Sequence, residues 1–184
     1  MTHEGIDNFG ENCADFVREN FIAGWNDFIG NKLKKYLEDS HFWIDRSIQI
    51  DASPGRVWKI LTAFPLNKKW TCGFGENGYV DTDFKQDSPV LWKMGDDTVC
   101  GKGVATICEP DRQWKTEFYG YNDCMQFNDQ LGAFSEDFQL AEQNGKTVLS
   151  IRSGPFNAKW HDMIYPGWDK ALPLVKQVAE DKSL

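Results

Sequence analysis

Few side chains in this sequence have the types and spacing that chemistry requires. The three histidines, His3, His41 and His161, lie far apart, and none is spaced with a cysteine or another histidine as zinc ligands are. His161 is flanked by Trp160 and Asp162 and could act as a general base, although a lone histidine before a helix is more often a capping or surface residue. The sequence therefore predicts no metal site, no cofactor and no catalytic set.

One carboxylate has a more informative position. Glu136 alternates with Phe134, Phe138 and Leu140, and in a strand all four would share one buried face. A buried carboxylate is costly unless it is paired or protonated, so Glu136 could anchor the amine or hydroxyl group of a ligand. The alternative is a place near a strand end, where the side chain reaches water, or a bulge that reverses the alternation.

Charge and composition exclude several classes of partner. The net charge is −8, which argues against nucleic acid and against anionic membrane surfaces, since both favour Lys and Arg. No apolar run approaches the roughly 20 residues of a membrane span, and residues 1–10 lack the pattern of a signal peptide. Aromatic residues make up 14% of the chain, which supplies a core and also suits a cavity lined by flat, rigid side chains.

The cysteines support a cytoplasmic location. They form an odd set without a Cys-x-x-Cys motif, which favours a reducing compartment and free thiols that mostly serve as small core residues. The five are Cys13, Cys72, Cys100, Cys108 and Cys124.

The chain then divides by its apolar periodicity. Spacings of three to four over residues 1–40 predict an N-terminal helical extension, followed by a domain over residues 41–184. Gly24 and Gly30 weaken the middle of the extension, so one helix or two shorter helices with a bend are both open. Its apolar stripe must pack against the rest of the protein or against a second copy.

A period of two over residues 42–50 predicts the first strand. Ser53 and Pro54 then provide an N-cap and a first helical position for a short helix that ends before Pro65. Residues 67–70 are expected to form a further helical turn or a loop. Later strands are expected at 78–84, 89–94, 98–108, 112–121, 132–141 and 146–153.

Asn144 and Gly145 suit a type I′ hairpin turn, the strongest hairpin signal in the chain. We expect Pro166 to separate a loop or short helix from a terminal helix that begins near Gly167, and Pro173 to kink that helix. Consecutive strands on short turns pair antiparallel, and a curved sheet needs a helix over its concave face. The predicted fold class is α+β, with a curved antiparallel sheet of about seven strands wrapped on a long C-terminal helix.

Several motifs in this order resemble one known family. They are Ala52-x-Pro54-x-x-Val57-Trp58-x-x-Leu61-Thr62, then Trp70, Gly101-x-Gly103, Glu109-Pro110, Trp114-Lys115-Thr116 and Gly167-Trp168. Over residues 42–182 the chain resembles the activator-of-HSP-90-ATPase-homologue branch of the START-like (SRPBCC) superfamily. The resemblance implies a helix-grip fold and, as in many relatives, a hydrophobic pocket between helix and sheet. It also implies a protein without a fixed catalytic motif.

Strand alternation predicts which side chains face that helix. With Lys93, Lys102 and Lys115 pointing outward, their strand neighbours point inward. Gly101 and Gly103 could then leave room for a ligand opposite large aromatic residues, or could merely admit the helix or a tight curl of the sheet. The predicted pocket residues are Trp70, Trp92, Met94, Trp114, Phe118, Glu136, Phe138, Trp160, Met163 and Trp168.

The leading functional hypothesis is a non-catalytic binder of a small, largely hydrophobic molecule. The first alternative is a protein-interaction module linked to a chaperone or self-associating through the N-terminal helix. The stretch from Gly24-Trp25 to Asp39 resembles that from Gly167-Trp168 to Asp181, through chance or as the terminal helix of a lost copy. The second alternative is a cyclase-type or hydrolase-type enzyme, for which Glu136 and His161 would be the acid and base.

Overall fold

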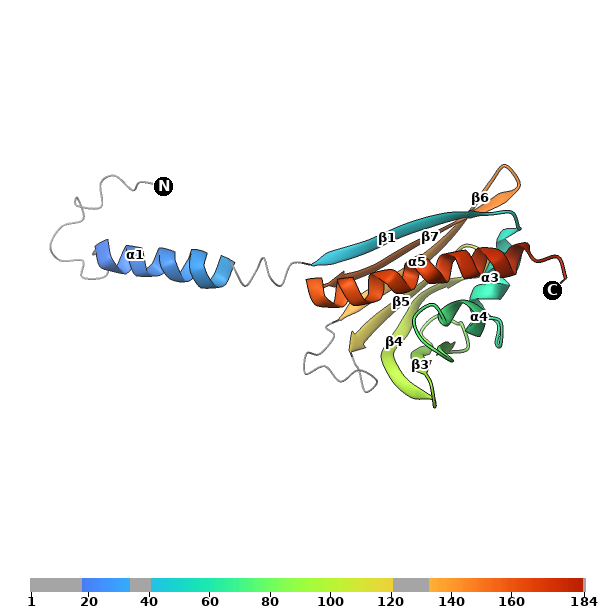
Figure 1. Cartoon of the computed structure of the whole chain (residues 1–184), viewed down its shortest axis with the longest axis horizontal. Helices are drawn as coiled ribbons and strands as arrows, with labels where there is room; N and C mark the ends of the chain where they lie inside the picture. The colour runs from blue at the N-terminus through green and yellow to red at the C-terminus, as the bar shows by residue number, and fades with distance from the viewer. Residues whose placement is uncertain (1–17, 34–40, 121–132, 184) are drawn as a thin grey trace. The chain divides into compact units, whose positions relative to one another are not determined.

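The computed structural model describes residues 18–33, 41–120 and 133–183 of the 184-residue chain (Figure 1). The chain divides into two compact units, Met1–Ser40 and His41–Leu184.

In the first unit, the α-helix α1 (Arg18–Asp27) continues into the π-helical segment η3 (Phe28–Leu33). The winding changes next to Asp27, whose carboxylate accepts a hydrogen bond from the Asn31 amide at 3.2 Å and pairs with Lys32 at 2.9 Å. None of residues 19–33 is buried. Within residues 18–33, the exposed large apolar side chains are Ile22, Trp25, Phe28, Ile29 and Leu33. The rest of the helix predicted for residues 1–40 lies outside the described residues.

The second unit contains a seven-stranded antiparallel sheet in the order β1-β7-β6-β5-β4-β3-β2, which confirms the predicted fold class. In Figure 1 the sheet curves around the long helix α5, which lies along its inner face. The strands are β1 (Phe42–Ile50), β2 (Tyr79–Asp81), β3 (Pro89–Met94), β4 (Thr98–Glu109), β5 (Gln113–Gly120), β6 (Phe134–Gln143) and β7 (Lys146–Phe156).

Local sequence explains where strands turn and stop. Asn144 and Gly145 have φ angles of 53° and 76°, as the predicted type I′ turn between β6 and β7 requires. Strand β2 is shorter than the predicted 78–84, because the chain soon leaves extended geometry, with φ of 50° at Phe84 and 64° at Asp87.

Two short helices follow β1 as predicted. Helix α3 (Pro54–Thr62) has Pro54 in its first turn, and the Ser53 hydroxyl accepts a hydrogen bond from the Arg56 amide at 3.4 Å. Helix α4 (Lys68–Thr71) supplies the one turn expected near residues 67–70. Its Trp70 is fully buried and stacks on Trp168 of the C-terminal helix at 6.1 Å.

The predicted start of the terminal helix is wrong. Helix α5 runs from Ala158 to Glu180 without a break, and Asn157 caps it by accepting the Trp160 amide at 3.0 Å. Pro166 and Pro173 lie within the helix and are exposed. Each proline removes one backbone hydrogen bond, but on the solvent side the carbonyl that loses its partner is hydrated, so the helix continues.

The expectation of free core thiols also needs correction. Cys72 is exposed and donates to the Lys69 carbonyl at 3.3 Å, a contact at the end of α4 that needs no core position. Cys108 is half-buried, and Cys100 is disulfide-bonded. Cys13 and Cys124 lie outside the described residues.

Candidate functional site

A cavity of about 210 Å³ lies between the inner face of the sheet and the first half of α5. We call it the Glu136 cavity. Strands β3, β4 and β6 form one wall, α5 forms the opposite wall, and the segment after α4 contributes Phe74. Its principal lining residues are Trp92, Met94, Gly101, Glu136, Trp160 and Met163.

Gly101 explains part of the space. A Cβ atom at Gly101 would lie 3.5 Å from the Trp92 Cβ and 3.6 Å from the Phe118 ring, which are ordinary contacts. Gly103 differs, because a Cβ there would lie 2.5 Å from the Glu117 carbonyl oxygen of β5. Gly101 therefore leaves space that the cavity occupies. Gly103 instead allows close packing of β4 against β5, and its contacts are to β5 and not to α5.

Glu136 is the third residue of β6, and it pairs with Thr116 of β5 on one side and Ser153 of β7 on the other. It is 6% exposed, so the alternative of a strand end or a reversing bulge is wrong. The Trp92 indole N–H donates to its Oε2 at 3.3 Å, and the Ser153 hydroxyl donates to its Oε1 at 3.4 Å. Burial raises the pKa of this carboxyl to about 7, and the two hydrogen bonds oppose the rise only in part.

Lys170 supplies the second charge of the cavity. It is exposed on α5 and lines the cavity, but within residues 18–33, 41–120 and 133–183 no cation lies within ion-pair distance of Glu136. The other lining side chains are apolar, apart from Cys100, which does not titrate because it is in a disulfide. The site thus combines apolar walls with one deep carboxyl and one ammonium at the rim.

The predicted pocket residues separate into two groups. Trp92, Met94, Glu136, Trp160 and Met163 line the cavity. The remaining five fill the core beside it: Trp70, Trp114, Phe118, Phe138 and Trp168, each at most 2% exposed.

Sequence reasoning missed several lining residues. Phe74 lies in the segment after α4, which carries no periodic pattern, and its ring meets Trp92 at 5.3 Å and Trp168 at 4.8 Å. Ile164 was missed as a lining residue because the first turns of α5 were expected to form a loop or separate helix. Lys170 lies within the predicted terminal helix and was missed because the pocket prediction considered mainly apolar side chains. Helical spacing from Trp160 onward was the signal that could have found them.

His161 does not join Glu136 in the cavity. Its ring packs against Phe42 at 5.5 Å and Tyr165 at 5.3 Å, and its Nδ1 lies 3.2 Å from the Asp162 carboxylate. It is absent from the described lining of the cavity. The acid–base pair that an enzyme of the cyclase or hydrolase type would need is therefore not assembled there.

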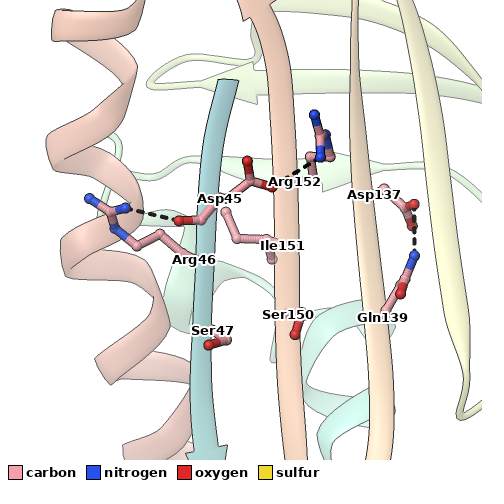
Figure 2. A pocket seen from close by; sticks show the side chains of 8 residues that line it. All are labelled: Asp45, Arg46, Ser47, Asp137, Gln139, Ser150, Ile151 and Arg152. Atoms are coloured by element: carbon pink, nitrogen blue, oxygen red, sulfur yellow. Dashed lines mark hydrogen bonds and ion pairs between the residues drawn. The ribbon is translucent and has the colours of Figure 1, made fainter. Parts of the chain in front are cut away.

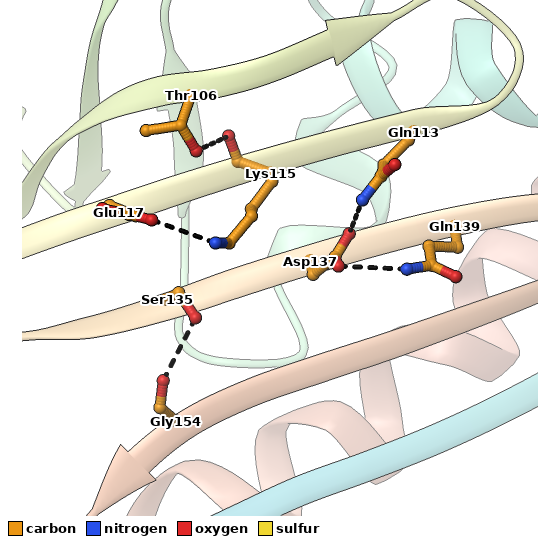
Figure 3. A network of polar contacts seen from close by, with 8 residues as sticks. All are labelled: Thr106, Gln113, Lys115, Glu117, Ser135, Asp137, Gln139 and Gly154. Atoms are coloured by element: carbon orange, nitrogen blue, oxygen red, sulfur yellow. Dashed lines mark hydrogen bonds and ion pairs between the residues drawn. The ribbon is translucent and has the colours of Figure 1, made fainter.

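The outer face of the sheet carries a second, polar hollow of about 450 Å³ across β1, β7 and β6 (Figure 2). Its charges already have partners, since Arg46 pairs with Asp169 at 2.9 Å and Arg152 with Asp45 at 3.7 Å. Figure 3 shows the adjoining network, in which Asp137 accepts hydrogen bonds from Gln113 and Gln139 at 2.9 and 3.1 Å. We read this face as a hydrated polar surface.

The described residues contain neither a metal site nor a membrane-spanning helix. Across them, no group of three or more His, Cys, Asp or Glu side chains could hold a metal ion. Nor does that part of the chain contain a helix long and apolar enough to cross a membrane.

Several solved structures share this fold. Protein MLL2253 from Mesorhizobium loti matches with a TM-score of 0.64 and 15% identity, covering 78% of this chain and 100% of its own. CalU16 from Micromonospora echinospora matches with a TM-score of 0.58 and 15% identity, covering 77% and 78%. The Aha1 dimer from Colwellia psychrerythraea matches with 0.58 and 16%, covering 76% and 97%. No family model and no curated protein matches the sequence. At these identities the likeness establishes the helix-grip fold alone.

Proposed function

We propose that this protein binds a small, largely hydrophobic molecule in the Glu136 cavity and does no chemistry on it. The observation that carries the proposal is the cavity itself, which has aromatic and methionine walls around a single buried carboxyl. Apolar walls with a few polar groups that fix orientation are typical of small-molecule sites. The flexible Met94 and Met163 side chains can adapt to ligands of somewhat different shape.

The volume limits the size of the ligand. Pockets for drug-sized molecules span about 300–1,000 Å³, whereas this cavity has about 210 Å³. An apolar cavity of about 150 Å³ can hold benzene. A compound with one ring and a short side chain is therefore the expected size.

Filling the cavity tests the proposal. We expect a small-molecule adduct in native mass spectra of the protein purified from cells, and its loss in Gly101→Leu, whose side chain would occupy the space. Gly101→Ala is the matched control, because its Cβ makes only ordinary contacts. Met163→Trp fills the same cavity from the helix and serves if Gly101→Leu does not fold. An adduct that survives in both filled variants would contradict binding at this place.

We also propose a second role, self-association through residues 18–33. Ile22, Trp25 and Ile29 recur at helical spacing and are 50%, 36% and 55% exposed. The solved Colwellia psychrerythraea relative is a dimer. Together with the sequence resemblance, it supports membership of the activator-of-HSP-90-ATPase-homologue branch and a chaperone link as further proposals.

Light scattering tests this role directly. The full chain is expected to be dimeric, and the double variant Trp25→Asp, Ile29→Asp is expected to be monomeric with an unchanged thermal midpoint. Lys32→Asp, a charge change in the same unit outside the stripe, is the control. A monomeric wild-type chain at high micromolar concentration would refute the self-association.

A further inference from the structure

Glu136 is buried in the cavity, and no cation among the described residues lies within ion-pair distance of it. Its two hydrogen-bond donors, the Trp92 indole and the Ser153 hydroxyl, are neutral and lie at 3.3 and 3.4 Å, the long end of the hydrogen-bond range. A carboxylate offers about four lone-pair positions on its two oxygens, so these two bonds leave acceptor capacity unused. The side chain lines the cavity, which gives a bound molecule access to it.

Resting on the proposed function, we propose that the ligand is an amine with a small apolar body, whose ammonium group pairs with the Glu136 carboxylate inside the cavity. An ammonium has several donors and no acceptor, which complements a carboxylate that only accepts. A charge-assisted hydrogen bond between them is shorter and stronger than a bond between neutral groups.

An amine suits this site better than an alcohol or a hydrocarbon of the same size. A hydrocarbon leaves the buried charge uncompensated, and an alcohol offers one neutral donor, as Trp92 and Ser153 already do. Of the three, only an ammonium carries the positive charge that neutralises the buried carboxylate. The apolar body then contacts the rings and methionine side chains of the opposite wall, where burial of its surface favours binding.

The other groups around Glu136 determine what else the ligand carries. Besides Glu136, Lys170 of α5 is the only charged side chain among the described lining residues. Cys100 of β4 is held in a disulfide, and Trp92 of β3 and Ser153 of β7 carry no charge. Lys170 is exposed at the rim. It repels a second positive charge on the outer end of the ligand, so a monoamine is favoured over a diamine.

The pairing makes binding depend on pH in a specific direction. Burial raises the pKa of Glu136 to about 7, so roughly one-tenth of the protein carries the ionised side chain at pH 6 and roughly nine-tenths at pH 8. An aliphatic amine has a pKa near 10 and remains charged over this range. The affinity for an amine should therefore rise about tenfold from pH 6 to pH 8. A neutral compound of the same size should show no rise.

Three probes of equal size separate the alternatives: benzylamine, benzyl alcohol and ethylbenzene, each with eight non-hydrogen atoms. Their dissociation constants are measured by calorimetry at pH 6 and pH 8 with the full chain. Benzylamine is expected to bind most tightly at pH 8 and to gain about tenfold over pH 6. Glu136→Gln should abolish both the preference and the gain, while Asp137→Asn should leave both intact. Asp137 is the matched control because it lies on the same strand but faces the outer side (Figure 3).

A further variant distinguishes a loss of binding caused by misfolding from one caused by the loss of the carboxylate. In Trp92→Phe the carboxylate loses a donor that lowers its pKa, so the pH at which benzylamine binding rises should move upward. Benzylamine affinity that is independent of pH, or no greater than that of ethylbenzene at pH 8, would overturn the amine proposal while leaving the hydrophobic site in place. If none of the three probes binds, the proposed function fails together with this inference.

Discussion

Two groups of aromatic side chains lie at the interface between α5 and the sheet, and they differ in how closely their rings pack. In the packed cluster, Trp114 stacks on Phe138 at 4.8 Å, and Trp168 of α5 lies 5.5 Å from the same phenylalanine. In the Glu136 cavity, Trp92 and Trp160 flank open space. In the packed cluster Trp70 also stacks on Trp168, whereas the cavity borders Gly101, which has no side chain to fill the space.

The two regions also differ in charge. The five residues of the packed cluster, taken as Trp70, Trp114, Phe118, Phe138 and Trp168, are neutral. The cavity contains a carboxyl that burial disfavours in its ionised form. Dense packing supplies stability, while a cavity and a buried charge both lower it. The comparison indicates that the packed cluster contributes more to stability than the neighbouring cavity does, as expected if the cavity binds the proposed ligand.

The largest expected effect tests the packed cluster. Trp168→Ala should lower the free energy of unfolding by about 3–5 kcal/mol, since the ring is 1% exposed and its loss leaves a large void. Met163→Ala, five residues earlier on the same helix, should lower it by only about 2 kcal/mol, the lower limit for such a change, because that side chain already borders a cavity. Urea denaturation of both variants gives the two values. Equal losses would mean that the two regions do not differ in packing.

The next effect tests the difference in charge. The pKa of Glu136 is about 7 in the folded protein against an ordinary value of 4.5. Between these values the folded state binds more protons than the unfolded state, so the contribution of Glu136 to stability falls as pH rises. The full loss, reached above pH 7, is roughly 3 kcal/mol at 1.36 kcal/mol per pKa unit.

Denaturation of wild type and Glu136→Gln at pH 5 and pH 8 isolates this group, because titration of the other residues is common to both proteins. The wild type should lose more stability than the variant between the two pH values. Asp137→Asn should behave like the wild type. A wild type that is stabilised relative to Glu136→Gln as pH rises would show that Glu136 has a charged partner when folded.

Sequence alternation predicted much of this interface. It placed Trp92, Trp114 and Glu136 on inner faces, and the burial of all three follows that pattern. Alternation does not show which inward side chains pack against others and which border a cavity. That depends on pairing across strands, such as Gly101 opposite Trp92, and on irregularities such as the register shift between Trp92 and Lys93. The sequence therefore predicted a cavity on the inner face of the sheet, but not which residues form its boundary.

The helix that completes the cavity was harder to predict. Pro166 indicated a boundary, yet α5 continues through it, with the proline exposed at the edge of the cavity and not packed in the core. Phe74 was missed for another reason, because an irregular segment has no periodicity from which the direction of a side chain can be predicted. Its position depends on tertiary contacts with Trp92 and Trp168.

A smaller effect sharpens the difference between the two glycines of β4. Gly103→Ala should lower the free energy of unfolding by about 1–3 kcal/mol, because its Cβ would overlap the Glu117 carbonyl oxygen of the adjacent strand. Gly101→Ala should change stability by less than about 1 kcal/mol, since its Cβ enters the cavity at ordinary contact distance. Thermal denaturation compares the two. A greater loss in Gly101→Ala would indicate that the space beside it is already filled.

The smallest effect concerns the cap of α5 on the cavity side. Asn157 accepts the Trp160 amide at 3.0 Å, and Asn157→Ala should lower stability by about 1 kcal/mol because a helix-end donor loses its partner. The loss should be local: hydrogen exchange should quicken for the amides of residues 160–163. It should stay unchanged for the buried Ala171, Leu172, Val175 and Val178. Asn157→Asp, which keeps the accepting oxygen, is the control. If exchange quickened equally along the whole helix, the cavity end and the packed end would open as one unit, and the two regions would not differ in local stability.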